Sequence, residues 1–172
     1  MEFTEKLKSH GFSLAKVEDT DFESYCTVKK VCYEKYVVRY YGGWDDAFQH
    51  NMNKTAFENT KGHTAFYKIL MQDEVVGFFS FNVKADVIED LTIQMLPQAR
   101  NKGIGTFYLH YLTALAKQEH KPVVLKVFQS NPAKALYERH GFRVYEDIRT
   151  HFMMKYDPDN GTEGMVYEES TI

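Results

Sequence analysis

The stretch that decides the fold is QARNKGIGTFYLHYL, Gln98–Leu112, which places an arginine, a lysine and two glycines before a strong helical pattern. Amides freed at the start of a helix point outward and carry partial positive charge. Glycine lets a phosphate approach without meeting a Cβ. The stretch therefore indicates a phosphate site, with a plain solvated glycine loop as the alternative.

Two common phosphate-binding motifs are excluded. A Walker loop needs GxxxxGK followed by Ser or Thr, and a dinucleotide-binding turn needs GxGxxG. The chain has neither and offers only Gly103-Ile104-Gly105. What remains is Arg-x-x-Gly-x-Gly at Arg100–Gly105, preceded by an apolar run that ends at Pro97. The segments flanking this turn must decide its role.

Composition and charge narrow the class of protein. The 172 residues are 44% apolar and 26% charged, which is typical of one soluble globular domain. Of the net charge of −3, residues 157–172 carry −5 and leave +2 on the rest. Nucleic-acid binders usually show a clustered basic face, so we expect no nucleic-acid partner. Residues 157–172 are expected to form a mobile acidic tail.

The cysteines and the apolar runs indicate a cytoplasmic protein. Cys26 and Cys32 lie six apart in an expected helix, on different sides of it, and so cannot bridge each other. The scattered histidines show no metal-ligand spacing, so no metal is expected. The N-terminal segment lacks the apolar centre of a signal peptide, and no run approaches a membrane span; no membrane partner is expected.

Hydrophobic periodicity predicts eleven helices and strands in the order β-α-α-β-β-β-α-β-α-β-β. This order combines an antiparallel meander with one β-α-β crossover, which makes the fold class α+β. A single domain is expected over residues 1–156. The expected segments are, in chain order, Phe12–Glu18, a helix from Asp19–Asp21 to Gly42, Asp46 to about Asn59, His63–Met71, Glu74–Val83, Asp86–Leu96, Thr106 to about Glu119, Val123–Phe128, Asn131–His140, Phe142–Tyr145 and Thr150–Tyr156.

Two sequence blocks carry a resemblance to a known family. The first is the apolar run to Pro97 followed by Arg100–Gly105, and the second is NPAKALYERHGF at Asn131–Phe142. Their order and spacing resemble those of the GNAT superfamily of acyl-CoA-dependent N-acetyltransferases. The match is close over Asp86–Tyr156, and the earlier segments agree only in their order. The resemblance implies a mixed, mostly antiparallel central sheet in which the fourth and fifth strands splay apart.

The resemblance also implies acetyl-CoA, or coenzyme A, as the donor cosubstrate. The pantetheine arm would lie between the splayed strands and pair with main-chain groups as an extra strand. The amide of Ile93 would donate to the thioester carbonyl. The residues expected to contact this cosubstrate are Ile93, Gln94, Met95, Arg100, Asn101, Lys102, Gly103, Ile104, Gly105, Thr106, Asn131 and Lys134.

Acetyl transfer to an amine needs a base and a proton donor for the leaving thiolate. Glu89 is the candidate base, at the position of a glutamate base in the histone-acetylating branch; strand alternation puts it on the face of Leu91 and Ile93. Because an ordinary glutamate has a pKa of about 4.3, burial or a water relay has to assist it. Tyr137 is the candidate donor to the thiolate. The alternatives are a solvated strand end for Glu89 and a packing role for Tyr137.

The acceptor site is expected in the poorly matched front half. Trp44 and Asp45, in the helix–helix connection, are candidates to wall a pocket and to attract an ammonium group. Their alternative is a hydrophobic plug with a helix-capping aspartate. Tyr67 and Phe79 are further candidate wall residues, whereas the tyrosines of the first long helix are interpreted as core.

The leading hypothesis is an acetyl-CoA-dependent N-acetyltransferase that acts on a primary amine of a small metabolite or peptide, by direct attack in a ternary complex. Within the same fold, a protein N-terminus or a lysine is an alternative acceptor. From another class comes a non-catalytic acyl-CoA-binding sensor. A monomer and a homodimer are both compatible with the sequence.

Overall fold

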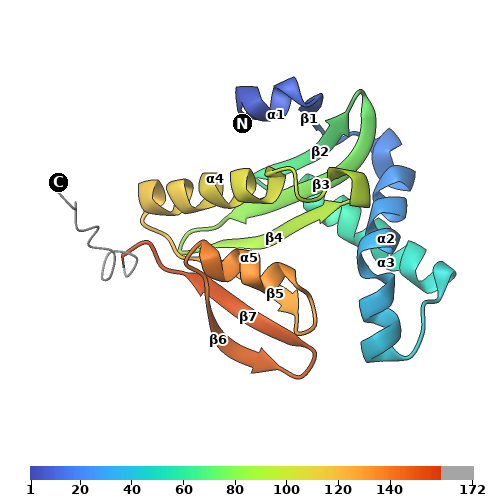
Figure 1. Ribbon diagram of the computed structural model, residues 1–172. Helices are drawn as coiled ribbons and strands as arrows, with labels where there is room; N and C mark the ends of the chain where they lie inside the picture. The colour runs from blue at the N-terminus through green and yellow to red at the C-terminus, as the bar shows by residue number, and fades with distance from the viewer. Residues whose placement is uncertain (160–172) are drawn as a thin grey trace, which may run out of the picture.

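The computed structural model describes residues 1–159, and Figure 1 shows one sheet with helices on both faces. The seven strands are ordered β1-β2-β3-β4-β5-β7-β6. The predicted element order and the mixed, mostly antiparallel sheet are confirmed. The elements are α1 (Glu5–Ser9), β1 (Phe12–Lys16), η1 (Asp19–Asp21), α2 (Phe22–Tyr41), α3 (Asp46–Lys61), β2 (Ala65–Met71), β3 (Glu74–Val83), β4 (Ile88–Met95), η2 (Pro97–Ala99), α4 (Ile104–Glu119), β5 (Val123–Phe128), α5 (Ala133–Arg139), β6 (Arg143–Ile148) and β7 (His151–Tyr156).

Strands β4 and β5 are the parallel neighbours in this sheet, and they separate almost at once. Their pairing consists of a single position, Ile88 with Val123. Beyond this position each strand pairs only on its other side, β4 with β3 and β5 with β7. The predicted splay of the fourth and fifth strands is therefore confirmed, and it opens a gap in the middle of the sheet.

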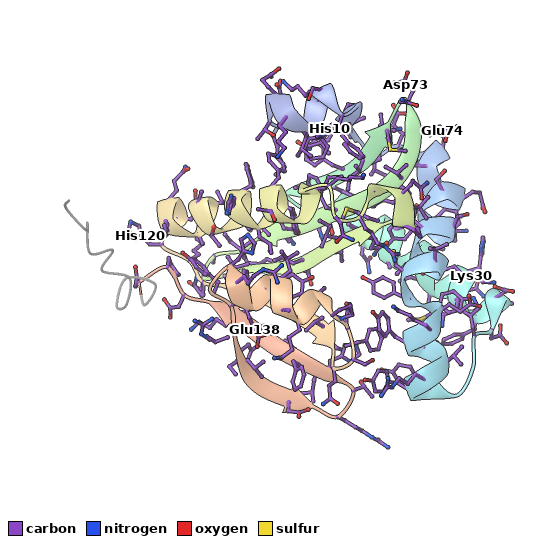
Figure 2. The ribbon with its side chains drawn as sticks, in the orientation of Figure 1. His10, Lys30, Asp73, Glu74, His120 and Glu138 are labelled. Carbon is purple, nitrogen blue, oxygen red and sulfur yellow. The ribbon has the colours of Figure 1, made fainter. Side chains whose placement is uncertain are left out.

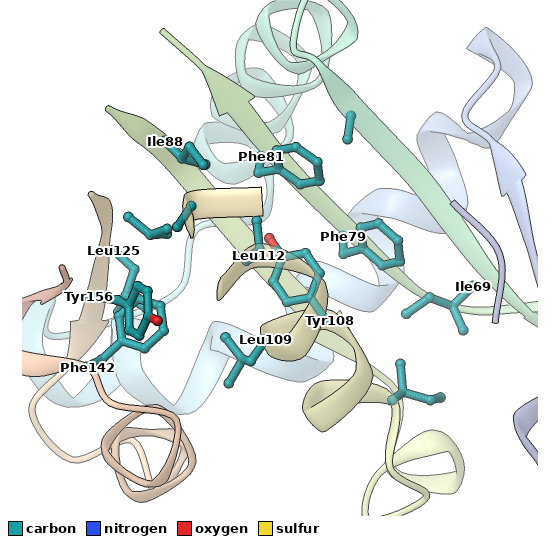
Figure 3. Packing of buried hydrophobic residues seen from close by; sticks show 14 of the residues in the cluster. Ile69, Phe79, Phe81, Ile88, Tyr108, Leu109, Leu112, Leu125, Phe142 and Tyr156 are labelled. Carbon is teal, nitrogen blue, oxygen red and sulfur yellow. The ribbon is translucent and has the colours of Figure 1, made fainter. Parts of the chain in front are cut away.

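Two apolar clusters, one on each face, hold the sheet between its helices. On the α4 side, Tyr108 and Leu112 pack with Phe79 and Phe81, as Figure 3 shows. On the other side, rings from α2 and α3 pack on Phe78. Successive residues of β3 thus face opposite clusters, as strand alternation requires. Because β3 is buried on both faces and pairs with β4, it holds β4 in position, and β4 forms one wall of the gap.

Three local features differ from the sequence prediction. The short helix α1 was not predicted; the hydroxyl of Thr4 caps it by accepting a hydrogen bond from the amide of Leu7. Helix α3 starts at Asp46 as expected, with the carboxylate of Asp45 as its cap, but it runs to Lys61, beyond the expected end near Asn59. Helix α4 begins at Ile104, two residues before the expected start, because Gly103 with a φ of +94° turns the chain directly into it.

Other expectations concern the cysteines and the C-terminal segment. Both Cys26 and Cys32 are free, as predicted. The expected mobile acidic tail falls, from residue 160 onward, outside the described residues. Within residues 1–159, no helix combines the length and the apolar character that a bilayer crossing requires.

Candidate active site

A cavity of about 840 Å³ occupies the gap between β4 and β5. Helix α2 closes it on one face of the sheet, and the N-terminal turn of α4 together with α5 bounds it on the other. This volume is in the range of small-molecule and cofactor sites. The cavity is lined by Cys32, Tyr33, Lys35, Tyr36, Leu91, Thr92, Ile93, Met95, Arg100, Asn101, Gly103, Gly105, Thr106, Lys126, Val127, Phe128, Asn131, Pro132, Ala133, Leu136, Tyr137, Arg139 and His151.

The start of α4 presents free amides to one end of this cavity. The first backbone bond of the helix runs from the amide of Phe107 to the carbonyl of Gly103. Within the described chain, the amides of residues 101–106 have no hydrogen-bond partner. A Cβ added at Gly103 would meet nothing within 4 Å, so the backbone there is open to a ligand. Together with the helix dipole, these groups form an anion-binding surface.

Gly105 has a packing role as well. A Cβ at this position would lie 2.9 Å from Cδ2 of Leu136 on α5. Glycine therefore lets α4 approach α5 closely, which keeps Tyr137, next to Leu136, against the cavity.

The edge of β4 that faces the gap carries unpaired main-chain groups. The amide of Leu96 donates to the carbonyl of Val76, so alternate residues of β4 point toward β3 and the residues between them point toward the gap. Ile93 is one of the residues that point toward the gap. The carbonyl of Met95 also points there but accepts Nε of Arg100 at 2.8 Å and Sγ of Cys32 at 3.4 Å.

Arg100 is consequently turned toward β4. Its guanidinium lies against the Met95 carbonyl and 3.9 Å from Sγ of Cys32, although the residue still lines the cavity. From the family resemblance, Arg100 is expected to contact the cosubstrate. In this structure its guanidinium instead fixes the end of β4 that leads into the α4 turn.

A β-bulge in β4 corrects the predicted orientation of Glu89. Thr92 pairs with Ser80, and Glu89 pairs with Asn82, so β4 has one extra residue here; Asp90 takes a φ of +56°. Paired residues share a face. Glu89 therefore lies on the face of Thr92, toward α2, and not on the face of Ile93 as strand alternation had predicted. Glu89 does not line the cavity, whereas Thr92 does.

Tyr137 reaches the cavity from α5. Its ring contacts that of Phe142 at 6.0 Å between centroids, which anchors it to the core of the sheet. Burial raises the pKa of Tyr137 to about 12. The phenol thus remains protonated at neutral pH and is available as a hydrogen-bond donor inside the cavity.

An aromatic wall lines the α2 side of the cavity. Phe128 of β5 stacks with both Tyr36 and Tyr40 of α2, at 5.0 and 5.6 Å between ring centroids. His151 of β7, which pairs with Phe128 of β5, has its ring centroid 4.0 Å from that of Phe128. Tyr40 also accepts a hydrogen bond from the amide of Ser130 at 3.1 Å. These contacts fix α2 over the open end of the gap.

His151 is held neutral in this wall. Burial first, and the charge of Lys126 second, lower the pKa of His151 to about 4. The hydroxyl of Thr150 lies 2.7 Å from Nδ1. The imidazole is therefore uncharged at neutral pH and contributes a polar, neutral edge to the cavity.

Nine of the residues predicted for catalysis or cosubstrate binding line the cavity, and five do not. The side chain of Gln94 is buried on the α2 face of β4, and the side chain of Ile104 lies in the core. Lys134 forms an ion pair with Glu138 (labelled in Figure 2) and does not line the cavity. Lys102 and Glu89 also lie outside the lining. The nine lining residues are Ile93, Met95, Arg100, Asn101, Gly103, Gly105, Thr106, Asn131 and Tyr137.

The four predicted acceptor residues lie away from the cavity. Trp44 donates to the carboxylate of Asp46, beside Lys30 (Figure 2), and Asp45 caps α3. Phe79 is fully buried in the α4-side core. Tyr67 lines a separate hollow of about 260 Å³.

Several lining residues were missed by the sequence analysis. Tyr33 and Tyr36 lie three apart on α2, a spacing that fits a core face and a cavity wall equally well. Lys126 is the one polar residue in the strand VVLKVF, and this break in the apolar run was the available signal. Arg139 and His151 had no sequence signal that we can identify.

Residues 29–142, more than half of the chain, match the acetyltransferase (GNAT) family. The fold, the splayed strands and the glycine turn agree with this match, and the chain belongs to that family. Two curated relatives are the cysteine-rich protein 2-binding proteins of Mus musculus and Homo sapiens, each 33% identical over 101 residues, or 57% of this chain. The match spans only 13% and 12% of those proteins, roughly an eighth of their length.

Three solved structures illustrate the fold similarity. The PaiA N-acetyltransferase of Thermoplasma acidophilum, in complex with coenzyme A, has a TM-score of 0.62 at 18% identity, over 85% of this chain and 98% of that one. The ribosomal-protein-S18-alanine N-acetyltransferase of Escherichia coli has a TM-score of 0.61 at 19% sequence identity. The match covers 94% of this chain and 99% of that one. Arabidopsis thaliana Naa50, in complex with a bisubstrate analogue, has a TM-score of 0.61 at 15% sequence identity. The match covers 86% of this chain and 99% of that one.

Proposed function

We propose that this protein transfers an acetyl group from acetyl-CoA to a primary amine of a small metabolite or peptide. The observation that carries the proposal is the convergence of three groups on one cavity. The free amides 101–106 suit a diphosphate, the gap-facing amide of Ile93 suits a thioester carbonyl, and the protonated Tyr137 suits a departing sulfur. Solved relatives with coenzyme A or a coenzyme A conjugate support this choice of donor.

The transfer is a direct attack in a ternary complex. The amine nitrogen forms a bond to the acetyl carbon while the carbon–sulfur bond breaks, and the amide of Ile93 stabilises the negative charge on the carbonyl oxygen. Tyr137 donates a hydrogen bond to the leaving thiolate. Its pKa of about 12 exceeds the ordinary thiol value of about 8.5, so the final proton of the thiol comes from solvent.

The proton that the amine loses needs an acceptor. Glu89 fills this role through a water relay, because it lies on the α2 face next to Thr92 but does not itself line the cavity. The cavity-lining cysteine, Cys32, has its sulfur engaged with the Met95 carbonyl, which disfavours a covalent acyl carrier. A reduced compartment such as the cytoplasm suits the two free thiols.

The experiment that tests this proposal measures free thiol released from acetyl-CoA across a panel of primary amines, with acetylated product identified by mass spectrometry. We expect amine-dependent thiol release and one acetyl group on the amine. Tight binding of acetyl-CoA without turnover on any amine, peptide N-terminus or lysine peptide would contradict it and favour a non-catalytic sensor.

A further inference from the structure

The charges that line the cavity have one sign. Four lining residues are cationic, and among the described residues no Asp or Glu contributes to the lining. Arg100 and Arg139 belong to the α4 turn and to α5, on the side of the free amides. Lys35 and Lys126 come from α2 and β5 and are not needed to explain the diphosphate site.

Lys126 lies on the α2 face of the sheet. Leu125 and Val127 point into the α4-side core. Lys126 and Phe128 alternate with them and therefore point the other way, where Phe128 meets α2. The ammonium of Lys126 is near enough to help lower the pKa of His151. On the facing helix, the ammonium of Lys35 lies 4.7 Å from the ring centroid of Tyr36.

Neither lysine has a carboxylate partner within residues 1–159. Other lysines of the chain do: Lys30 lies 2.7 Å from Asp46, Lys61 lies 2.6 Å from Asp19 and Lys68 lies 2.9 Å from Asp21. Two uncompensated positive charges on the walls of one concave site raise the local concentration of anions and repel cations.

We propose that the acceptor amine also carries an anionic group, a carboxylate or a phosphate, which binds to Lys35 and Lys126. This inference rests on the proposed function and specifies its substrate class. The rings of Tyr33, Tyr36 and Phe128 accommodate the apolar part of the acceptor. Polycationic amines are rejected, because both lysines repel a second ammonium group.

The first test compares amines that differ only in the anionic group. Phenylalanine, its amide and phenylethylamine share one ring, and 2-aminoethyl phosphate against ethanolamine separates phosphate from carboxylate. We expect kcat/KM for phenylalanine or 2-aminoethyl phosphate to exceed that of its neutral counterpart by ~10-fold, because the anionic group gains ionic hydrogen bonds to the lysines. Equal values, or a preference for spermidine, would overturn the inference.

The phenylalanine amide controls for the basicity of the amine. An α-amino group next to a carbonyl has a pKa of about 7.7–8.0, so the amide offers more unprotonated amine at neutral pH than phenylethylamine, with an alkylamine pKa near 10.4. If basicity alone set the rate, the amide would be the best acceptor of the three. That result would also overturn the inference.

The second test removes the two lysines. Lys35→Met and Lys126→Met should each raise KM for the preferred anionic acceptor by ~10-fold and leave KM for the neutral counterpart and for acetyl-CoA unchanged. Lys155→Met is the matched control: Lys155 lies on β7, pairs with Val124 of β5 and is outside the cavity, beside Asp157. It should leave all three values unchanged.

The outcomes separate the inference from the proposed function. If KM for acetyl-CoA rises in the lysine variants as much as KM for the acceptor, the lysines serve the donor phosphates and the inference is wrong. If amines of every charge are acetylated equally, the inference fails while the proposed function stands. If acetyl-CoA binds but no amine is acetylated, the proposed function fails and this inference fails with it.

Discussion

Tyr137 combines a packing contact with a place on the cavity wall. Its ring packs on Phe142 while it lines the cavity, and the same burial raises its pKa to about 12. The block Asn131–Phe142 predicts its position on a helix after β5, and Tyr137 lies on α5. The burial that sets its pKa depends on the rest of the fold and was not readable from the sequence.

Replacing Tyr137 by phenylalanine tests the proton-donor role. Tyr137→Phe keeps the ring and its packing but removes the hydroxyl, so we expect turnover to fall by ~10²-fold with little change in acetyl-CoA affinity. Steady-state kinetics and calorimetry measure the two quantities. Tyr145→Phe, an exposed tyrosine of β6, is the control. An undiminished rate would remove the donor role.

Glu89 is tested in the same way. Glu89→Gln preserves the size and removes the base, and we expect kcat to fall by ~10²-fold with KM for acetyl-CoA unchanged. Glu74→Gln, at the exposed start of β3, is the matched control. Full activity of the Glu89 variant at neutral pH would contradict the role of Glu89 as the base and would mean that water alone accepts the amine proton.

At the scale of elements, the bulge in β4 is the feature that strand periodicity does not predict. Asp90 takes a left-handed φ, so the alternation that relates Glu89 to Ile93 is broken between them. The sequence carried no glycine to mark this position. The family resemblance implied that β4 splays from β5. The structure confirms this, because the two strands pair at a single position.

The strain at Asp90 gives a stability prediction. Aspartate and asparagine tolerate a positive φ, whereas a β-branched residue does not. Asp90→Val should therefore lower the free energy of unfolding by about 1–2 kcal/mol. Asp90→Asn also removes the charge near His63 but should stay within ~0.5 kcal/mol of the wild type. Urea denaturation measures both, and equal stability of the two variants would contradict the bulge.

The α4 turn is tested by a pair of glycines with the same local geometry. Gly103 and Gly42 both have a positive φ, and an added Cβ meets nothing within 4 Å at either position. Gly103→Glu and Gly42→Glu therefore impose similar strain and the same charge. We expect the first to abolish coenzyme A binding and the second to leave it unchanged, by calorimetry. Unaltered binding in both would refute the phosphate site.

At the scale of the whole molecule, more of the residues predicted for the donor than of those predicted for the acceptor line the cavity. The proposed donor side is built from contiguous blocks, Arg100–Thr106 and Asn131–Tyr137, whose backbone geometry follows from their glycines and helix starts. The proposed acceptor side is assembled from α2, β5 and β7. The register of the sheet brings Phe128 and His151 together. That register depends on long-range pairing, so the sequence does not indicate that Tyr36 and Lys126 line the cavity while Trp44 and Asp45 lie outside it.

The assembled site also makes the stability of the fold depend on pH. The pKa of His151 is about 4 when folded and about 6.5 when unfolded, so between these values the unfolded state binds more protons. Stability should thus be full above pH 6.5 and fall as pH drops, by about 1–2 kcal/mol at pH 5. His151→Gln should flatten this slope in urea titrations at pH 5 and 7.5. An equal slope in both proteins would contradict the buried neutral imidazole.

The central claim is that coenzyme A binds in the gap between β4 and β5 with its diphosphate at the start of α4. A crystal structure of the protein with coenzyme A tests this claim most directly. We expect the diphosphate on the amides of residues 101–106, the pantetheine arm along the free edge of β4 at Ile93, and the sulfur beside the hydroxyl of Tyr137. Coenzyme A bound outside the gap between β4 and β5, or with its diphosphate away from the start of α4, would contradict the claim.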